Sequence, residues 1–470
     1  MRLVARPGVR RHGHRRVLRV VVMSLLSSPL TSHALLAQGV VVSAAPALGE
    51  SPWTLERVVT RALSQHPLLE AARAHVGAAR GEMVTASALP NPVATFWMEN
   101  AGFPGQELQV PLNREASTYV TWPLEPLLQR STRIRRADED IKVAESSLKL
   151  ARRQVAADAA RAFFHVALAQ ALAEEAEENR DRLDQLASYN RARVDEGLTA
   201  ESELLRIQVE HDRAATEVAF ANVSLARARG ELAPYVGTVE NERAGLTFVR
   251  VDVPNTIAPM PSSLPSLDWV FARARNERPE LVASRARVAA AAAAIDVERT
   301  LSIRQWGATL GSKRVEGQNS MVLGVNLAVP LFNRNRGGVA RATSEQLAAE
   351  HQLAWSERTI AADVASAYDA ATQLTRQLGE LQDSFLKRAE EVHNLTLGAY
   401  QEGGATLLQV LDATRLLADA RLTYSRALFA QRESVFDLAL AAGAEPADAV
   451  SLLPAWSPAP SMNSREGVAP

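Results

Sequence analysis

The sequence contains no cysteine among its 470 residues. This absence excludes disulfides, thiolate metal sites and a cysteine nucleophile, and we expect no lipid anchor on a cysteine near the N-terminus. Aromatic residues make up only 5% of the chain, although hydrophobic residues make up 47%, and much of the apolar content is alanine. Small side chains of this kind favour closely packed long helices over a bulky globular core.

Positive and negative charges are nearly balanced, since the formal net charge is -1. This balance gives no argument for nucleic acid as a partner. Beyond the N-terminal region, no run reaches the roughly 18–20 apolar residues of a membrane-spanning helix, so any membrane-inserted part must consist of strands. The nine histidines form no HxxxH or HExxH set, and no glycine-rich phosphate loop is present. We therefore expect no catalytic residues, no cofactor and no metal site.

Residues 1–47 have the layout of a secretory signal peptide. An apolar stretch over residues 17–30 follows a basic region, and small residues continue to Ala47. Cleavage after Ala34, Ala44 or Ala47 fits equally well. The basic region contains Arg2, Arg6, Arg10, Arg11, Arg15, Arg16 and Arg19. The layout predicts export from the cytoplasm.

One module occurs twice in the remaining chain. Residues 54–80 align without a gap with residues 266–292, which pairs Leu55 with Leu267 and Pro67 with Pro279. Two later segments repeat in the same order and at nearly constant spacing: 155–170 with 360–373, and 194–205 with 400–411. Alanine-rich helices can imitate a repeat, but the matching proline and glycine positions argue for a true duplication.

The duplication divides the chain into five parts. The two copies occupy residues 48–233 and 266–443, and a proline-rich linker over 234–265 joins them. The signal peptide precedes the first copy. Residues 444–470 are rich in proline, serine and glycine, and this composition predicts a disordered tail.

Each copy contains a long helical hairpin. Residues 125–196 and 330–402 each give about 70 residues of helical pattern with no proline beyond their starts. At 1.5 Å per residue such a helix is about 100 Å long, which is typical of a coiled-coil rod. A glycine-containing turn ends each rod, at Gly197 and at Gly403, and a returning helix follows to about Leu232 in the first copy.

Each copy also contains two strands. Residues 321–329 alternate between apolar and small or polar side chains, and residues 305–314 alternate in the same way across a short loop. In the first copy the strands are residues 92–99 and 118–125. Four strands cannot close a barrel, but three chains would supply twelve, which is within the range of outer-membrane barrels. Three tryptophans are expected at the membrane interfaces: Trp97, Trp122 and Trp306.

These features together resemble the TolC-like outer-membrane efflux protein family over residues 54–443. The resemblance rests on three features. The first is the pair of corresponding dipeptides His66-Pro67 and Arg278-Pro279. The others are the strand-to-helix junction VPLFNRNRG (329–337) and the turn with its return helix EGGATLLQVLDATRLLADARLTYSRAL (402–428). The PNP motif at residues 90–92 and the junction resemble most the heavy-metal branch, which is CzcC-like and CusC-like.

The resemblance implies a mainly α fold with membrane β structure. Its trimer forms a 12-stranded outer-membrane β-barrel and a periplasmic α-helical tunnel. The implied function is a passive exit duct of a tripartite efflux system for heavy-metal cations. A periplasmic adaptor and an inner-membrane pump, for which the RND type is one candidate, would be its partners.

Two alternatives stay open at this point. A duct for drug efflux or type I protein secretion shares most of the pattern. A periplasmic coiled-coil scaffold would explain the rods, but it would not explain the one-sided apolar strand. An enzyme built on helical repeats is disfavoured by the absence of a convergent catalytic set.

The resemblance also implies site residues at the inner end of the tunnel. Gln409 and Asp412 match positions that line the closed aperture, and only Asp412 keeps the acid. A ring of three carboxylates would favour cations. Tyr400 matches a position that ties the closed hairpins together, and its implied partner is Glu203, next to Ser202.

Gly197 and Gly403 allow tight turns that the tips of an adaptor could approach closely. Turn geometry alone would explain both glycines equally well.

Overall fold

The computed structural model describes residues 53–100, 114–236, 264–302, 305–315 and 317–445. The predicted signal peptide lies outside these residues, as do most of the predicted linker and tail. Two predicted boundaries differ by a few residues. The last helix of the first copy continues to Val236, inside the predicted linker, and Ala444, the first residue of the predicted tail, is buried at 2% exposure.

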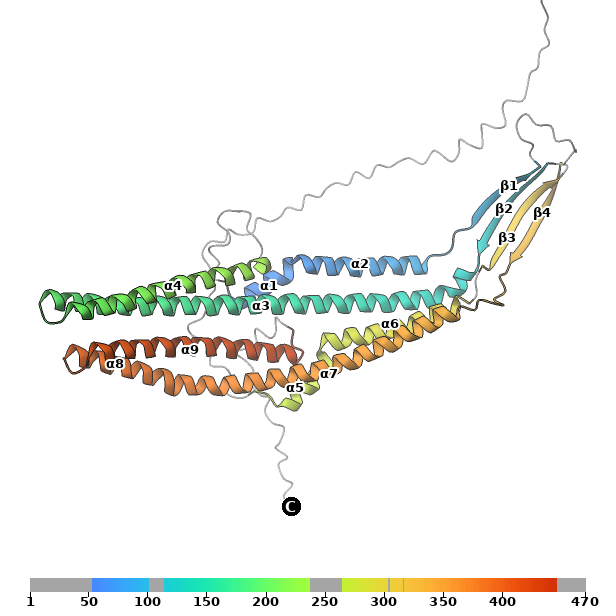
Figure 1. The fold of residues 1–470 in the computed structure, drawn as a ribbon. Helices are drawn as coiled ribbons and strands as arrows, with labels where there is room; N and C mark the ends of the chain where they lie inside the picture. Colours follow the sequence, from blue (N-terminus) through green and yellow to red (C-terminus); the bar gives the residue numbers. More distant parts are fainter. Residues whose placement is uncertain (1–52, 101–113, 237–263, 303–304, 316, 446–470) are drawn as a thin grey trace, which may run out of the picture. The chain divides into compact units, whose positions relative to one another are not determined.

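The first copy consists of α1 (Leu55–Gln65), α2 (Pro67–Ser87), β1 (Val93–Glu99), β2 (Glu115–Pro123), α3 (Glu125–Asp195) and α4 (Glu201–Val236). Thr54 caps α1 by accepting a hydrogen bond from the backbone N–H of Arg57 at 3.2 Å. Pro67 is the first residue of α2, where its missing N–H costs nothing. Figure 1 shows α3 and α4 side by side as the predicted first hairpin.

The second copy repeats this order with α5 (Leu267–Glu277), α6 (Pro279–Thr300), β3 (Gly307–Val315), β4 (Gln318–Asn326), α7 (Arg336–Glu380), a π-helical turn η1 (Leu381–Leu386), α8 (Lys387–Gln401) and α9 (Leu407–Ala441). The predicted helix over 330–402 was therefore wrong in two respects. It begins only at Arg336, because Asn335 has a left-handed backbone with φ +55°. It is also interrupted by η1 between α7 and α8.

The π-helical turn keeps the two copies in register. Before it, buried residues of α3 and α7 lie 205 positions apart, as Val155 and Ile360 do. After it, the spacing is 206, as for the turn glycines Gly197 and Gly403. The second copy thus has one extra residue, and a π turn can accommodate such a residue without rotating the rest of the helix.

The four described strands form one antiparallel sheet in the order β1-β2-β3-β4. The pairing of β2 with β3, in which Val120 lies opposite Leu310, joins the two copies. Val315 pairs with Gln318, so the β3–β4 loop has two residues and Gly317 has φ +84°. This loop is shorter than predicted, and β4 therefore ends at Asn326 rather than at residue 329.

The two faces of the sheet differ in polarity. One face carries apolar side chains that are all exposed in the single chain: Phe96, Val120, Trp122, Leu310, Met321, Leu323 and Val325. On the opposite face Glu115 pairs with Lys313, and the hydroxyls of Thr121 and Thr309 lie 3.0 Å apart. Trp97 pairs with Ser117 and lies on this polar face, whereas Trp122 lies on the apolar face.

The largest core cluster lies where α3 packs against α1, α4 and α9. The rings of Phe164 on α3 and Phe436 on α9 meet edge to face, with 5.9 Å between their centroids. No helix in the described part of the chain is long and apolar enough to cross a membrane.

Candidate functional site at the hairpin turns

The two hairpins turn at glycines with a left-handed backbone. Gly197 has φ +73° and Gly403 has φ +82°. The N–H of Leu198 donates to the carbonyl of Arg193 at 2.8 Å, and the N–H of Gly404 donates to the carbonyl of Ala399 at 2.7 Å. These bonds satisfy carbonyls at the ends of α3 and α8. Open space surrounds the Cα atoms of both turn glycines.

Both glycines are predicted to be required for the turn. Replacing Gly403 by valine places a β-branched residue at positive φ, which costs roughly 1–2 kcal/mol. We expect Gly403→Val to lower the thermal unfolding midpoint measured by circular dichroism. Gly398→Ala is the control, because Gly398 lies inside α8 and an added Cβ atom would meet no neighbouring atom within 4 Å. Equal midpoints for the valine variant and the unaltered chain would contradict the requirement.

Two of the predicted site residues stabilise the starts of the return helices. Gln409 forms a capping box with Thr406, since its Oε1 accepts from the Thr406 N–H at 2.8 Å. Glu203 accepts a hydrogen bond from the Thr199 hydroxyl at 2.7 Å near the start of α4. Ser202 is exposed beside it.

Tyr400 joins the two hairpins through a different partner from the predicted one. Its hydroxyl donates to Oδ1 of Asn190 on α3 at 2.6 Å, and both residues are buried. The Asn190 amide in turn donates to the Leu186 carbonyl at 3.0 Å. Burial raises the pKa of Tyr400, so the hydroxyl stays protonated and able to donate. Within the chain, the Tyr400 hydroxyl therefore donates to Asn190 and not to Glu203, the partner that the resemblance implied.

Aromatic and apolar contacts surround this hydrogen bond. The rings of Tyr400 and Tyr189 meet edge to face at 6.3 Å. The guanidinium of Arg193 lies 5.3 Å from the centroid of Tyr400 and 5.7 Å from that of Tyr189. A small core cluster continues from here between the hairpins, and it includes Leu183, Leu186, Ile207, Leu407, Val410 and Leu411.

Asp412 lies on the exposed side of α9, with its side chain 64% exposed. Arg415 is 3.6 Å from its carboxylate and also pairs with Glu210 on α4. The Asp412 carboxylate therefore has a guanidinium close by. This pairing weakens the negative potential that the acid alone would create.

A layer of charged residues, which no sequence motif had indicated, lies further from the turns. Arg421 on α9 pairs with Glu178 and Glu175 of α3 and with Glu390 of α8. Burial raises the pKa of Glu175 and lowers the pKa of the nearby His393. In the described residues, no group of three or more His, Asp or Glu side chains is arranged to hold a metal ion.

The comparisons with known proteins agree with this architecture. Residues 270–444 match the family described as outer membrane efflux protein. The chain is 25% identical over 381 residues to the cobalt-zinc-cadmium resistance protein CzcC of Cupriavidus metallidurans, covering 81% of this chain and 87% of the relative. It is 28% identical to the nickel and cobalt resistance protein CnrC of the same organism, covering 63% of this chain and 68% of the relative.

A crystal structure of CusC has the same fold, with a TM-score of 0.68 at 18% identity, covering 83% of this chain and 92% of CusC. The relatives are efflux channels rather than enzymes. Residues 270–444 thus carry the pattern of the outer membrane efflux proteins, and the chain as a whole is similar to heavy-metal resistance proteins and has the fold of CusC.

Proposed function

We propose that this chain is the outer-membrane component of a tripartite efflux system. It is a passive exit duct, with its sheet in the outer membrane and its helical hairpins forming a tunnel in the periplasm. A periplasmic adaptor and an energised inner-membrane pump complete the system. The exported substrates are heavy-metal cations.

The observation that carries this proposal is the two-faced sheet on two long hairpins. Met321, Leu323 and Val325 are 70–79% exposed on one face, whereas the other face carries the Glu115–Lys313 pair. An exposed apolar face of this size is unfavourable in water and favourable in lipid. A polar opposite face suits an aqueous lumen.

The sheet also supports a trimer. In the described part of the chain, β1 and β4 are the edge strands and have only one partner each. If β4 of one copy pairs with β1 of the next, three copies close a barrel of twelve strands. Closure would satisfy the backbone groups of both edges, which is required within a bilayer.

The contacts at the hairpin turns support a gate at the inner end of the tunnel. The Tyr400–Asn190 hydrogen bond, which we term the latch, holds the second hairpin against the first. Asp412 and Gln409 lie on the first turns of α9 and would surround the aperture. Because Arg415 lies next to Asp412, the aperture alternates in charge rather than being purely acidic. The open surroundings of Gly197 and Gly403 suit contact with an adaptor.

The heavy-metal substrate class is supported by the relatives. One is named for resistance to cobalt, zinc and cadmium, and another for resistance to nickel and cobalt. We infer that the same class of divalent cations leaves through this duct, with the pump selecting among them.

A deletion and bilayer experiment tests the proposal. A strain without this chain should lose tolerance to cobalt, zinc or cadmium salts, and the restored gene should return it. The purified protein should be a trimer that requires detergent and conducts ions in planar bilayers. A water-soluble monomer without conductance would contradict the duct. Loss of tolerance to hydrophobic drugs alone would keep the duct but reject metals as its substrate.

A further inference from the structure

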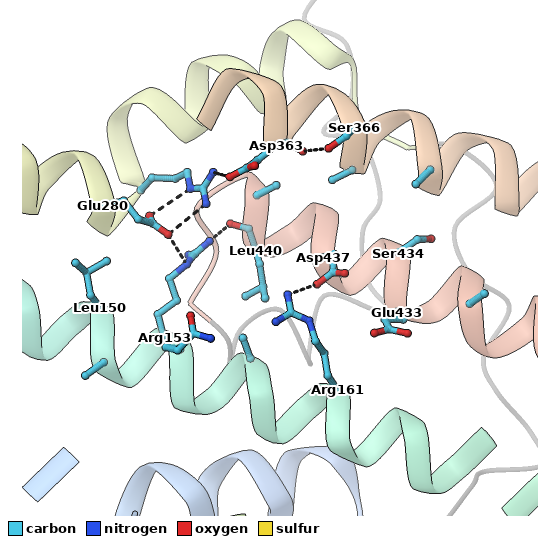
Figure 2. A pocket seen from close by; sticks show the side chains of 18 residues that line it. Leu150, Arg153, Arg161, Glu280, Asp363, Ser366, Glu433, Ser434, Asp437 and Leu440 are labelled. Atoms are coloured by element: carbon cyan, nitrogen blue, oxygen red, sulfur yellow. Dashed lines mark hydrogen bonds and ion pairs between the residues drawn. The ribbon is translucent and has the colours of Figure 1, made fainter. Parts of the chain in front are cut away.

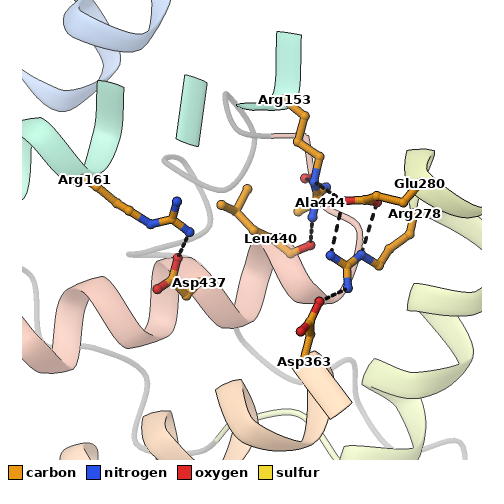
Figure 3. A network of polar contacts seen from close by, with 8 residues as sticks. All are labelled: Arg153, Arg161, Arg278, Glu280, Asp363, Asp437, Leu440 and Ala444. Atoms are coloured by element: carbon orange, nitrogen blue, oxygen red, sulfur yellow. Dashed lines mark hydrogen bonds and ion pairs between the residues drawn. The ribbon is translucent and has the colours of Figure 1, made fainter. Parts of the chain in front are cut away.

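Several arginines in the helical part of the chain are paired with carboxylates. Figure 2 shows Arg161 of α3 donating to Asp437 of α9 at 2.9 Å, and both residues line a cavity of about 920 Å³. Figure 3 shows Arg153 of α3, whose guanidinium lies 3.3 Å from the carboxylate of Glu280 on α6. These pairs neutralise one another and offer little charge to a further partner. Arginines without such a carboxylate lie beside an exposed apolar surface between β4 and α7.

The connection between β4 and α7 is longer than its counterpart in the first copy. β4 ends at Asn326 and α7 begins at Arg336, so that nine residues separate them. In the first copy a single residue, Leu124, separates β2 from α3. The second copy thus has a loop over residues 327–335, which we term the junction loop, although one residue is enough to connect a strand to a long helix in this fold.

Polar side chains hold the junction loop against α6. The Asn335 amide donates to the backbone carbonyl of Glu298 at 2.8 Å and to its carboxylate at 2.7 Å. The N–H of Asn335 donates to Oδ1 of Asn333 at 3.0 Å, and Nε of Arg334 donates to the carbonyl of Pro330 at 3.2 Å. The backbone of the loop is therefore fixed by its own polar groups, and its apolar side chains take no part in this.

The apolar face of the sheet continues into the junction loop. Every second residue from 321 to 331 is apolar and 52–79% exposed: Met321, Leu323, Val325, Leu327, Val329 and Leu331. Phe332 comes directly after this series and is fully exposed. Because the proposed function places the apolar face of the sheet in lipid, the same lipid-facing surface extends beyond the last paired residue of β4 as far as Phe332.

Two cations follow this apolar surface directly. Arg334 and Arg336 are exposed, and neither forms an ion pair with another residue that the structure describes. Glu298, the acid that contacts the loop, is paired with Arg341 instead, at 2.8 Å. A guanidinium binds phosphate oxygens through parallel N–H donors. An aromatic ring followed by cations is typical of the membrane–water interface, where the ring lies at the level of the headgroups.

We propose that the junction loop binds anionic phospholipids at the periplasmic surface of the outer membrane. Leu331 and Phe332 insert into the periplasmic leaflet, and Arg334 and Arg336 bind the phosphate groups of its lipids. The loop then fixes the depth at which the sheet gives way to the helices. This site rests on the proposed position of the sheet in the outer membrane, and it adds the residues and the class of lipid.

Fluorescence quenching by brominated lipids tests the insertion. The chain has no cysteine, so Phe332→Cys can be labelled alone with a bimane fluorophore. In vesicles of phosphatidylcholine with brominated acyl chains, we expect the fluorescence of this label to fall about twofold or more, since the loop lies at the interface. Glu350→Cys is the control, because Glu350 is exposed on α7, fourteen residues or about 21 Å from Arg336. Its label should not be quenched.

Lipid selectivity tests the two arginines. Phosphatidylglycerol should raise the unfolding midpoint of the channel in detergent at a lower concentration than phosphatidylcholine does, and inorganic phosphate should not raise it. The double variant Arg334→Gln with Arg336→Gln should need about tenfold more phosphatidylglycerol for the same rise, since two charge-assisted contacts are lost. The matched control is Arg376→Gln with Arg388→Gln, two exposed arginines further along the second hairpin, and it should keep the selectivity.

The outcomes separate the lipid site from the duct. A conducting channel whose label at position 332 escapes quenching would overturn the lipid site and leave the duct intact, because the loop would then lie against protein. An unchanged response of the double variant to phosphatidylglycerol would overturn the role of the arginines. A protein that neither inserts into vesicles nor conducts would overturn the site and the duct together.

Discussion

Tyr400→Phe is expected to leave the protein folded and to raise its basal conductance in planar bilayers by about tenfold or more. The substitution removes a 2.6 Å hydrogen bond and leaves the Oδ1 of Asn190 buried without a donor. Such a loss costs about 1–3 kcal/mol in each chain, and 1.4 kcal/mol corresponds to a tenfold change in an equilibrium. A trimer loses three such bonds, so the open state gains population over the closed one.

The Tyr400–Asn190 hydrogen bond joins the two hairpins, and its loss should therefore favour opening of the channel. Asn190 belongs to α3 of the first hairpin, and Tyr400 belongs to α8 of the second. If one hairpin moves away from the other, the bond breaks, whereas the hydrogen bonds within each helix stay intact. The ring of phenylalanine preserves the contacts with Tyr189 and Arg193, so the variant isolates the hydroxyl.

Two control variants sharpen this test. Glu203→Gln should change the conductance much less, because Glu203 accepts from Thr199 and does not contact the Tyr400 hydroxyl through a hydrogen bond. Asn190→Leu should leak at least as much as Tyr400→Phe. The proposed role of the latch is wrong if Tyr400→Phe conducts like the unaltered channel, or if Glu203→Gln alone reproduces the leak.

Most of the fold was predictable because its long elements have simple sequence signals. The helix predicted over residues 125–196 is confirmed as α3, which spans Glu125–Asp195. All four described strands were predicted, two of them from period-two alternation, but the ends of β2 and β4 were not. The start of β4 depends on the length of the β3–β4 loop, and the two-residue turn around Gly317 was not evident from composition alone.

The π-helical turn also has a signal in the sequence, although the helical pattern alone does not reveal it. The spacing between the copies is 205 at Val155 and Ile360, but 206 at Gly197 and Gly403. An extra residue must therefore lie between these points in the second copy. In a helix whose buried face continues on both sides, a π turn is the local structure that accommodates it.

The partner of Tyr400 could also have been found from α3 itself. Leu183, Leu186 and Ala187 follow the three- and four-residue spacing of a buried helical stripe, and Asn190 is the next position of that stripe. A buried asparagine requires hydrogen-bond partners, and it therefore indicates a polar group on the facing helix. Resemblance to a family gave Glu203 instead, because a transferred residue pair carries no information on which face each residue occupies in this chain.

The charged layer around Arg421 leads to the second large expected effect. Arg421→Met should reduce the free energy of unfolding by about 2–3 kcal/mol, because it leaves the partly buried carboxylate of Glu175 without its ion-pair partner. Arg415→Met on the same helix removes a more exposed pair with Glu210 and should cost less than about 1 kcal/mol. Arg421→Lys should recover part of the loss. Chemical unfolding followed by circular dichroism measures all three.

The pH dependence of the Arg421→Met variant gives the decisive comparison. Burial already raises the pKa of Glu175 above its ordinary value of 4.5, and Arg421 opposes this rise. Without Arg421 the folded state therefore holds a proton on Glu175 over a wider range than the unfolded state does. Unfolding releases that proton, so the stability of the variant falls as the pH rises above about 4.5.

The difference from the unaltered chain should consequently be small near pH 5 and largest near pH 7. His393, Arg182 and Glu390 also face this layer, and burial lowers the pKa of His393. Since Arg421 contacts helices of both hairpins, the loss should also loosen the second hairpin from the first. A stability difference that is the same at both pH values would mean that packing of the Arg421 side chain, rather than its charge, holds the hairpins together.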